Sequence, residues 1–329
     1  MSTYITKIEV EAYSLISNVD ESILRINPLL IKDGYEFLAI SLAEIEAKFH
    51  SVFSFPYNPN PQTFFRDENN NKLSVRFQAM LQNHEFSDNN TFSKRRLFFL
   101  KEKNDLTLRI ENNVILDNKE VMAFRIADYT HKLIHKLRLF KIGDIGSPIS
   151  FLKEKEGGNL LMSIKSPRYK NYRQKDFHLE EKDIEQLTTH LKLSFVPNEL
   201  TNLAYAHFML TYENFDARIK FLNLMSALES IFNLNPNQIS HTMARHLSIV
   251  LSSNAKEFQE NYKRIKNLYN IRSKISHGQS TKKKIDLDGL VEQLGNDFRK
   301  VIKFCLDISM NKRELFDYLN TKGFHIDPK

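Results

Sequence analysis

An arginine and a histidine with chemically useful spacing stand in the stretch YNIRSKISHG, at Arg272 and His277. The planar guanidinium of arginine matches the oxygens of a phosphate group and stabilises negative charge that develops on them. Histidine titrates near neutral pH and is suited to proton transfer. The pair could therefore act on a phosphate ester, provided that the fold brings the two side chains to one site.

Arg272 falls on the apolar face of a helix that the sequence predicts over residues 256–276. A guanidinium is seldom buried without a partner, so Arg272 must meet an acid, reach solvent, or line an interface or cleft. Glu229 has a similar inward position on a helix predicted over residues 215–232. A Glu229–Arg272 ion pair that fixes the register of the two helices is therefore the structural alternative to a role in a site.

His277 precedes Gly278 at the predicted end of the same helix. Glycine is the usual left-handed residue just after a helix, so His277 should lie in the last turn or at the cap. The negative end of the helix dipole favours a protonated imidazole there. On a regular helix His277 and Arg272 lie about 140° apart. They converge only if the helix end unwinds or a second chain contributes, and a cap or surface histidine is the alternative.

Basic residues concentrate between Met243 and Lys284, where ten Lys and Arg stand beside two acids. The whole chain carries a formal net charge of +7. This balance favours a polyanionic partner, and a solvated helix face is the alternative. The basic residues are Arg245, Lys256, Lys263, Arg264, Lys266, Arg272, Lys274, Lys282, Lys283 and Lys284.

The composition is typical of a globular protein, with 41% hydrophobic and 26% charged residues. No run approaches the roughly 18 apolar residues of a membrane helix. The first residues lack the basic and apolar regions of a secretory signal. The single cysteine, Cys305, cannot form a disulfide within one chain and suits a reducing compartment. We therefore expect a cytoplasmic protein that makes no use of a membrane.

The 329 residues predict two domains. Residues 1–195 are expected to form a β-rich domain with flanking helices at 121–140 and near 180–193. Its predicted strands are 4–15, 36–42, 72–80, 95–102 and 105–116. Residues 196–329 predict successive helices with short connections, which favours an antiparallel bundle. The expected fold class is α+β, a β-rich N-terminal domain followed by an all-α helical bundle.

The helical part resembles the HEPN superfamily, and the segment LYNIRSKISHG is most similar in sequence to its Apea-like branch. In this chain, as in that superfamily, the motif Arg-x4-His stands at the end of the third helix of the bundle. RIKFLNLMSALESIF and ISHTMARHLSIVL are similar to the first two helices of that branch. The resemblance covers about residues 199–312 and does not extend to the first 195 residues. It implies a metal-independent endoribonuclease without a cofactor, whose active site forms between two protomers.

By this resemblance Arg272 and His277 are the catalytic pair, and Glu229 is a supporting residue that holds the arginine. Ser273 matches a neighbouring position that is often polar in active members. RNA can be cleaved without a metal because its 2′-hydroxyl can attack the adjacent phosphate. A two-fold dimer would supply one histidine as base and another as acid. The residues expected to bind the RNA backbone are Lys274, Lys282, Lys283 and Lys284.

The resemblance also implies partners and a biological role. The expected partners are an RNA substrate and a second copy bound through the HEPN domain, with a regulatory partner or a phage component as trigger. Many members act in antiviral defence, in abortive infection or as toxins. The alternative is a non-catalytic RNA- or protein-binding module in which the arginine and histidine are structural.

Three other patterns each have a plain and a functional interpretation. His131 and His135 have a spacing that can bind zinc, but without a third ligand we expect solvated histidines and no metal site. KLIHKLRLFK, residues 132–141, could lie on a membrane surface, although packing on a sheet is favoured. SPRYKNYRQK, residues 166–175, suits single-stranded RNA or a charged linker.

Overall fold

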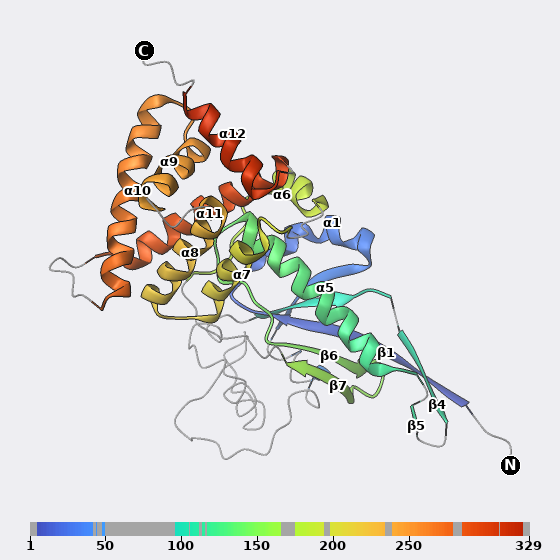
Figure 1. Ribbon diagram of the computed structural model, residues 1–329. Coiled ribbons are helices and arrows are strands. Elements are labelled where there is room, and N and C mark those ends of the chain that lie inside the picture. The colour runs from blue at the N-terminus through green and yellow to red at the C-terminus, as the bar shows by residue number, and fades with distance from the viewer. Residues whose placement is uncertain are drawn as a thin grey trace. The chain divides into compact units, whose positions relative to one another are not determined.

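The computed structural model describes residues 5–41, 44, 48–49, 96–104, 106–111, 114–115, 117–165, 175–193, 198–233, 239–278, 285–308 and 310–324. The chain divides into two compact units, Met1–Leu193 and Ser194–Lys329 (Figure 1). The first contains an antiparallel sheet and the second is helical, which confirms the predicted α+β class. The predicted strand at 72–80, residues 166–174 and the three lysines at 282–284 lie outside the described residues.

The N-terminal unit is built around the long strand β1 (Ile5–Ile16). β3 pairs with the C-terminal half of β1 and β4 with its N-terminal half, while β6 pairs along the other edge. All strand pairs are antiparallel, and seven strands form one sheet in the described part. The others are β2 (Tyr35–Ser41), β3 (Arg96–Glu102), β4 (Leu106–Glu111), β5 (Val114–Ile115), β6 (Ile149–Glu154) and β7 (Leu160–Lys165).

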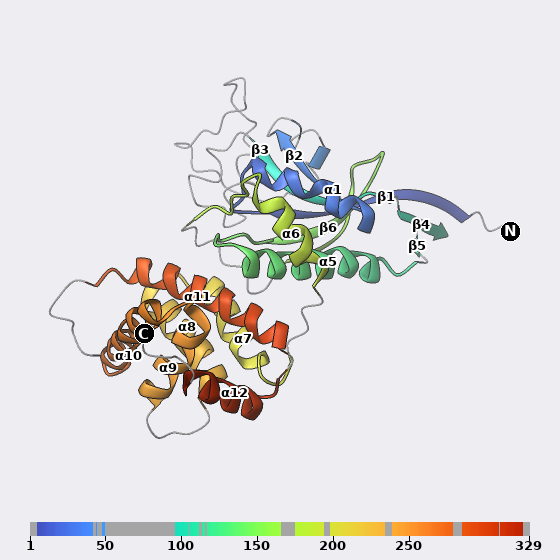
Figure 2. The same ribbon diagram turned by 90° about the horizontal axis from the view of Figure 1, so that it is seen from above.

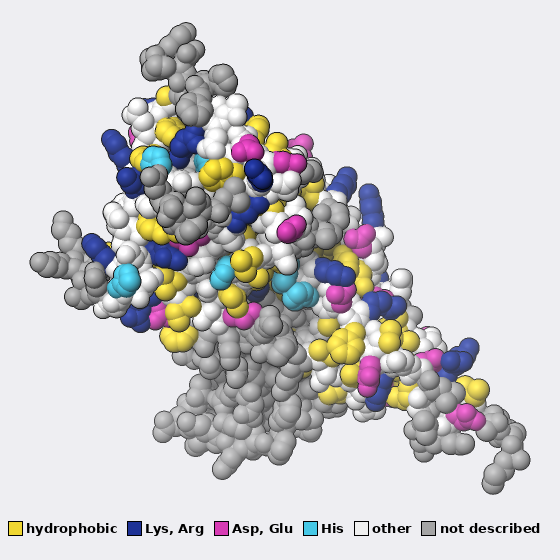
Figure 3. Space-filling model, viewed as in Figure 1, with side chains coloured by type: hydrophobic (Ala, Val, Ile, Leu, Met, Phe, Trp, Pro, Cys, Tyr) yellow, Lys and Arg dark blue, Asp and Glu magenta, His cyan; other side chains and the backbone are white. Residues whose placement is uncertain are grey.

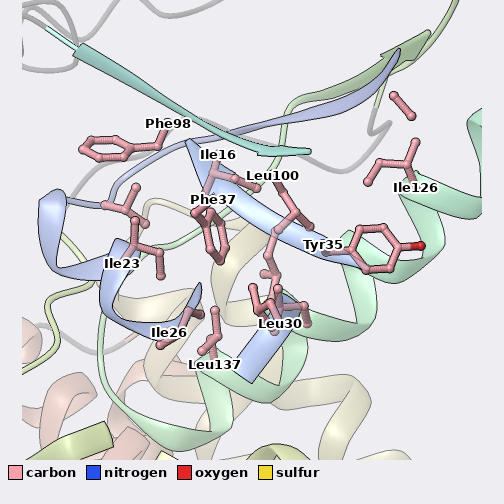
Figure 4. Packing of buried hydrophobic residues seen from close by; sticks show 14 of the residues in the cluster. Ile16, Ile23, Ile26, Leu30, Tyr35, Phe37, Phe98, Leu100, Ile126 and Leu137 are labelled. Atoms are coloured by element: carbon pink, nitrogen blue, oxygen red, sulfur yellow. The ribbon is translucent and has the colours of Figure 1, made fainter. Parts of the chain in front are cut away.

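Helix α5 (Lys119–Phe140) runs along one face of this sheet (Figure 2). Alternate residues of β1 face it, because side chains point to opposite sides of a strand in turn. Figure 4 shows Ile16, Phe37 and Leu137 directed into one apolar core. Short helical segments close the core: η1 (Glu21–Ile26), α1 (Asn27–Leu30), η2 (Ile31–Asp33) and α6 (Asp183–Lys192).

The packing of α5 on the sheet confirms the favoured interpretation of residues 132–141. Leu133, Ile134 and Leu137 on this helix are buried in the same core as the strands. Asn118 begins the helix, since its side chain accepts a hydrogen bond from the backbone N–H of Val121 at 3.1 Å. Among the described residues, no helix combines the length and apolar character needed to cross a bilayer.

The C-terminal unit consists of helices packed around α8 (Ala217–Phe232), which contacts its neighbours on several sides. Phe208 and Phe298 stack in the core with ring centroids 4.5 Å apart. Cys305 of α11 (Leu287–Ile308) is fully buried, and burial raises the pKa of its thiol to about 12. The other helices are α7 (Asn202–Leu210), η3 (Thr211–Glu213), α9 (Ile239–Leu251), α10 (Ala255–Ser276), α11 (Leu287–Ile308) and α12 (Lys312–Phe324).

Candidate functional site

Helix α10 positions both candidate catalytic residues. It begins at the N-cap Asn254, whose side chain accepts from the backbone N–H of Glu257 at 3.0 Å. The Glu257 carboxylate accepts in return from the Asn254 amide at 2.8 Å. Ile265 and Leu268 are buried against the neighbouring helices α8 and α9. This burial fixes the rotation of α10 and therefore the direction in which Arg272 points.

Arg272 is held by Glu229 of α8, as the helical wheel predicts. Its Nη2 donates a hydrogen bond to Oε2 of Glu229 at 3.0 Å, and Nε lies 2.9 Å from Oε1 at ion-pair distance. The Arg272 side chain is 28% exposed and the Glu229 side chain is 16% exposed, so the pair is partly buried and partly in contact with solvent. The guanidinium also lies over the Tyr269 ring, 5.7 Å from its centroid.

Two features of its surroundings shift the pKa of Glu229 in opposite directions. Burial raises the pKa of the Glu229 carboxyl, while the charge of Arg272 and its hydrogen bond lower it. A guanidinium offers five N–H donors. Among the described residues, Nη2 alone forms a hydrogen bond with the carboxylate, and Nε lies at ion-pair distance without one. Within the described part of the chain no hydrogen bond uses Nη1 of Arg272. Nη1 is therefore the part of the guanidinium with donors left for a further acceptor.

His277 is the C-cap of α10 and is exposed. Its backbone N–H donates to the carbonyl of Ser273 at 3.1 Å. Gly278 follows with φ +64°, the left-handed conformation that the sequence predicts after the helix. In the residues that the structure describes, the His277 imidazole forms no hydrogen bond or ion pair. It is therefore free to meet a second molecule.

One chain does not bring Arg272 and His277 together. Helix α10 stays regular to Ser276, so positions 272 and 277 face directions about 140° apart. Of the two residues that directly follow Arg272 in the sequence, Ser273 is half-buried and Lys274 is exposed. On the regular helix the side chains of Arg272 and His277 therefore do not share one face.

Two further arginines of the basic zone also point inward, which the sequence reasoning missed. Arg264 forms an ion pair with Asp297 of α11, with 2.7 Å between Nη1 and Oδ2. Burial raises the pKa of Asp297, and the Arg264 hydrogen bond and charge oppose that shift. Arg245 donates to the Oδ1 of Asn320 at 2.7 Å. Arg264 lies at a buried wheel position near Leu268, so the pattern that singled out Arg272 could have found it.

The histidine pair on α5 is close-packed. The rings of His131 and His135 have centroids 3.8 Å apart. Burial, followed by the charges of His131 and Arg138, lowers the pKa of His135 to about 3. The described residues contain no group of three or more His, Cys, Asp or Glu side chains arranged to hold a metal ion.

Comparison with known proteins gives no match, whether with family models, with curated proteins or with solved structures. The HEPN resemblance therefore rests on the motif residues of the sequence alone.

Proposed function

We propose that the chain is a metal-independent endoribonuclease of the HEPN type that works as a homodimer. The observation that carries this proposal is the ion pair between Glu229 and Arg272, which orients a guanidinium whose Nη1 forms no hydrogen bond within the described part of the chain. His277 at the exposed end of the same helix adds a group that can transfer a proton. The +7 net charge of the chain suits a polyanionic substrate.

The proposed reaction is an internal transfer at one phosphate of RNA. A histidine takes the proton of the 2′-hydroxyl, and the 2′-oxygen forms a bond to phosphorus. The bond from phosphorus to the 5′-oxygen breaks, and a second histidine gives that oxygen a proton. Arg272 stabilises the extra negative charge on the phosphorane. The products end in a 2′,3′-cyclic phosphate and a 5′-hydroxyl.

A dimer supplies what one chain lacks. Each chain has a single histidine at the motif, at a position that faces away from its own Arg272. A two-fold axis between helical units would place each group beside its mate and provide both a base and an acid. Ser273 and Lys274 adjoin the same turn, and Lys282, Lys283 and Lys284 follow it in the sequence. We assign these lysines to the RNA backbone.

The cellular role that fits such an activity is restriction of growth by RNA cleavage in the cytoplasm, as a toxin or in abortive infection during antiviral defence. A growth-arresting nuclease needs control, which a regulatory partner or a phage-derived trigger would provide.

The test is RNA cleavage by the purified protein and by the variants Arg272→Ala and His277→Ala. Each variant should fold and dimerise yet lose cleavage by about a hundredfold or more, since each removes a group that acts in the transition state. Arg218→Ala and His241→Ala, exposed positions elsewhere in the helical unit, are the matched controls and should cleave like the parent. Addition of EDTA should leave cleavage unchanged. Parental rates in either site variant, or a large loss on chelation, would contradict the proposal.

A non-catalytic RNA-binding module is the second candidate. Two observations favour it: the ion pair with Glu229 by itself accounts for the inward position of Arg272, and Arg272 and His277 lie about 140° apart on α10. The two residues would then be a structural arginine and a surface histidine. In that case the parent binds RNA and returns it at full length under every condition tested.

A further inference from the structure

The basic zone of the sequence separates into two classes in the structure. Its described arginines turn toward the helical unit, where each has a polar side-chain partner. Its described lysines beyond the first turn of α10 are all exposed, and in the described part of the chain none of them forms an ion pair. Arg245 and Arg264 are paired within the helical unit and Arg272 is assigned to the proposed site, so the charge that remains available to a partner is that of the lysines. They are Lys263, Lys266 and Lys274.

These lysines lie along one face of α10 together with exposed amides. The face, which we call the α10 stripe, is opposite the buried residues Ile265 and Leu268 on the wheel. At 1.5 Å per residue it is about 21 Å long and ends at the cap. α10 forms one edge of the helical unit (Figures 1 and 2). The stripe consists of Lys263, Lys266, Asn267, Asn270, Lys274 and His277.

The charge of the stripe has one sign. From Lys263 to Gly278 the sequence contains no Asp or Glu. Figure 3 shows Lys and Arg side chains spaced along the side of the helical unit where α10 runs. Two copies that met along the whole length of this face would place lysines opposite lysines, which is unfavourable, so the proposed dimer would share only the His277 end of the stripe. A chain of phosphates has the complementary charge, and amides such as Asn267 can donate hydrogen bonds to phosphate oxygens.

We propose that the α10 stripe binds the backbone of single-stranded RNA and leads it to His277. This inference rests on the proposed nuclease function and adds the path that the substrate takes. A stacked strand advances about 3.4 Å per nucleotide, so the stripe spans about six nucleotides. The contacts are to the backbone and carry no base specificity. The RNA enters near Lys263 and reaches the proton-transfer group at the C-terminal end of the helix.

The experiment measures binding and cleavage separately. Binding uses a 2′-O-methyl RNA oligonucleotide, which lacks the attacking hydroxyl and stays intact. The stripe variant is Lys263→Gln, Lys266→Gln and Lys274→Gln together. Its affinity should fall by about tenfold or more at low salt, and the slope of log affinity against log salt should fall by about 2, as expected for three phosphate contacts on a single strand. Exposed substitutions of this kind leave folding intact.

The matched control removes the same charge from other helices. Lys300→Gln, Lys303→Gln and Lys322→Gln together change exposed lysines of α11 and α12. This variant should bind like the parent. Equal losses in both triple variants would mean that only net charge matters and would overturn the stripe, as would parental binding by the stripe variant. A dinucleotide substrate too short to reach Lys263 should be cleaved at similar rates by the parent and by a variant that carries only Lys263→Gln and Lys266→Gln.

The two proposals fail in different ways. If the parent never cleaves RNA but loses binding in the stripe variant alone, the nuclease proposal fails and the stripe stands. If the parent cleaves long RNA and the stripe variant does so with unchanged KM, the stripe is wrong and the nuclease proposal stands. Binding of an acidic protein in place of the oligonucleotide, abolished by the same substitutions, would also overturn the assignment to RNA.

Discussion

The Glu229–Arg272 pair combines an energetic cost with a geometric benefit. Both side chains lose water on folding, and the rise in the pKa of Glu229 is the sign of that loss. In exchange, a carboxylate that contacts two nitrogens fixes the plane of the guanidinium. A lysine at position 272 would keep the charge and lose the plane. The pair is therefore suited to present an arginine to a planar set of phosphate oxygens.

A double-mutant cycle measures this coupling. Glu229→Gln and Arg272→Met should each lower the free energy of unfolding by about 1–2 kcal/mol, since each leaves a partly buried polar group without its partner. The double variant should lose less than the sum, with a coupling of about 1 kcal/mol or more. Urea unfolding gives the values. Additive losses would show that the two groups do not interact in solution, and the exposed Asp128–Lys132 pair of α5 is the control with the smaller coupling.

At the scale of elements, the sequence predicted the helices and their inward residues better than it predicted the strands. The wheel placed Arg272 and Glu229 inward, and Gly278 set the helix end, because helix contacts repeat within a few residues. The hairpin of β6 and β7 was missed. Lys153 on β6 is only 5% exposed because its Nζ lies 3.0 Å from Glu11 of β1. No local pattern reveals a charge whose partner stands so far away along the chain.

The candidate site was predictable in its parts and not in its assembly. Residue types and spacing gave Arg272, His277 and the supporting carboxylate. The separation of inward arginines from outward lysines depends on Asp297 and Asn320, which lie on helices distant in sequence. Whether two side chains about 140° apart act together depends on a second molecule, which no single sequence contains.

Helix α9 carries a buried histidine that should make the helical unit sensitive to acid. His246 is 1% exposed, and its Nε2 lies 3.0 Å from Oδ1 of Asn320. Its Nδ1 has no hydrogen-bond partner among the residues that the structure describes. Burial lowers the pKa of His246, the Asn320 hydrogen bond opposes this, and the charges of Arg245 and His241 add to it. The neutral ring is therefore the form that the fold accommodates.

The sign of the pH dependence follows from this lowered pKa. The stability that the neutral ring contributes is complete above the unfolded value of about 6.5 and is lost as the pH falls below it, by up to about 1.4 kcal/mol per pH unit. Urea unfolding at about pH 7.5 and about pH 5.5 should show a larger loss for the parent than for His246→Gln. His135 is common to both proteins and cancels in the comparison. Equal losses would show that His246 does not titrate with unfolding.

At the scale of the whole molecule, the proposed dimer can be tested by mixing subunits. When equal amounts of parent and His277→Ala protein exchange subunits, the activity per parent chain should fall to about half of its value in the parent alone. Only one quarter of random dimers would carry two parental histidines, and those dimers would contain about half of the parent chains. Cleavage of excess RNA is the measurement. Mixing with His241→Ala protein is the control and should leave the activity per chain unchanged. Unchanged activity with the His277→Ala partner would mean that a single chain suffices.

The lone thiol of Cys305 gives the protein a natural reporter of its own opening. Folded chains should resist alkylating reagents, since the sulfur lies beneath the helices and remains protonated. Each opening of that core exposes the sulfur, and mass spectrometry would record the event as one added label. Because the N-terminal unit has no cysteine, the rate of labelling would measure the opening of the helical unit alone, without any engineered probe.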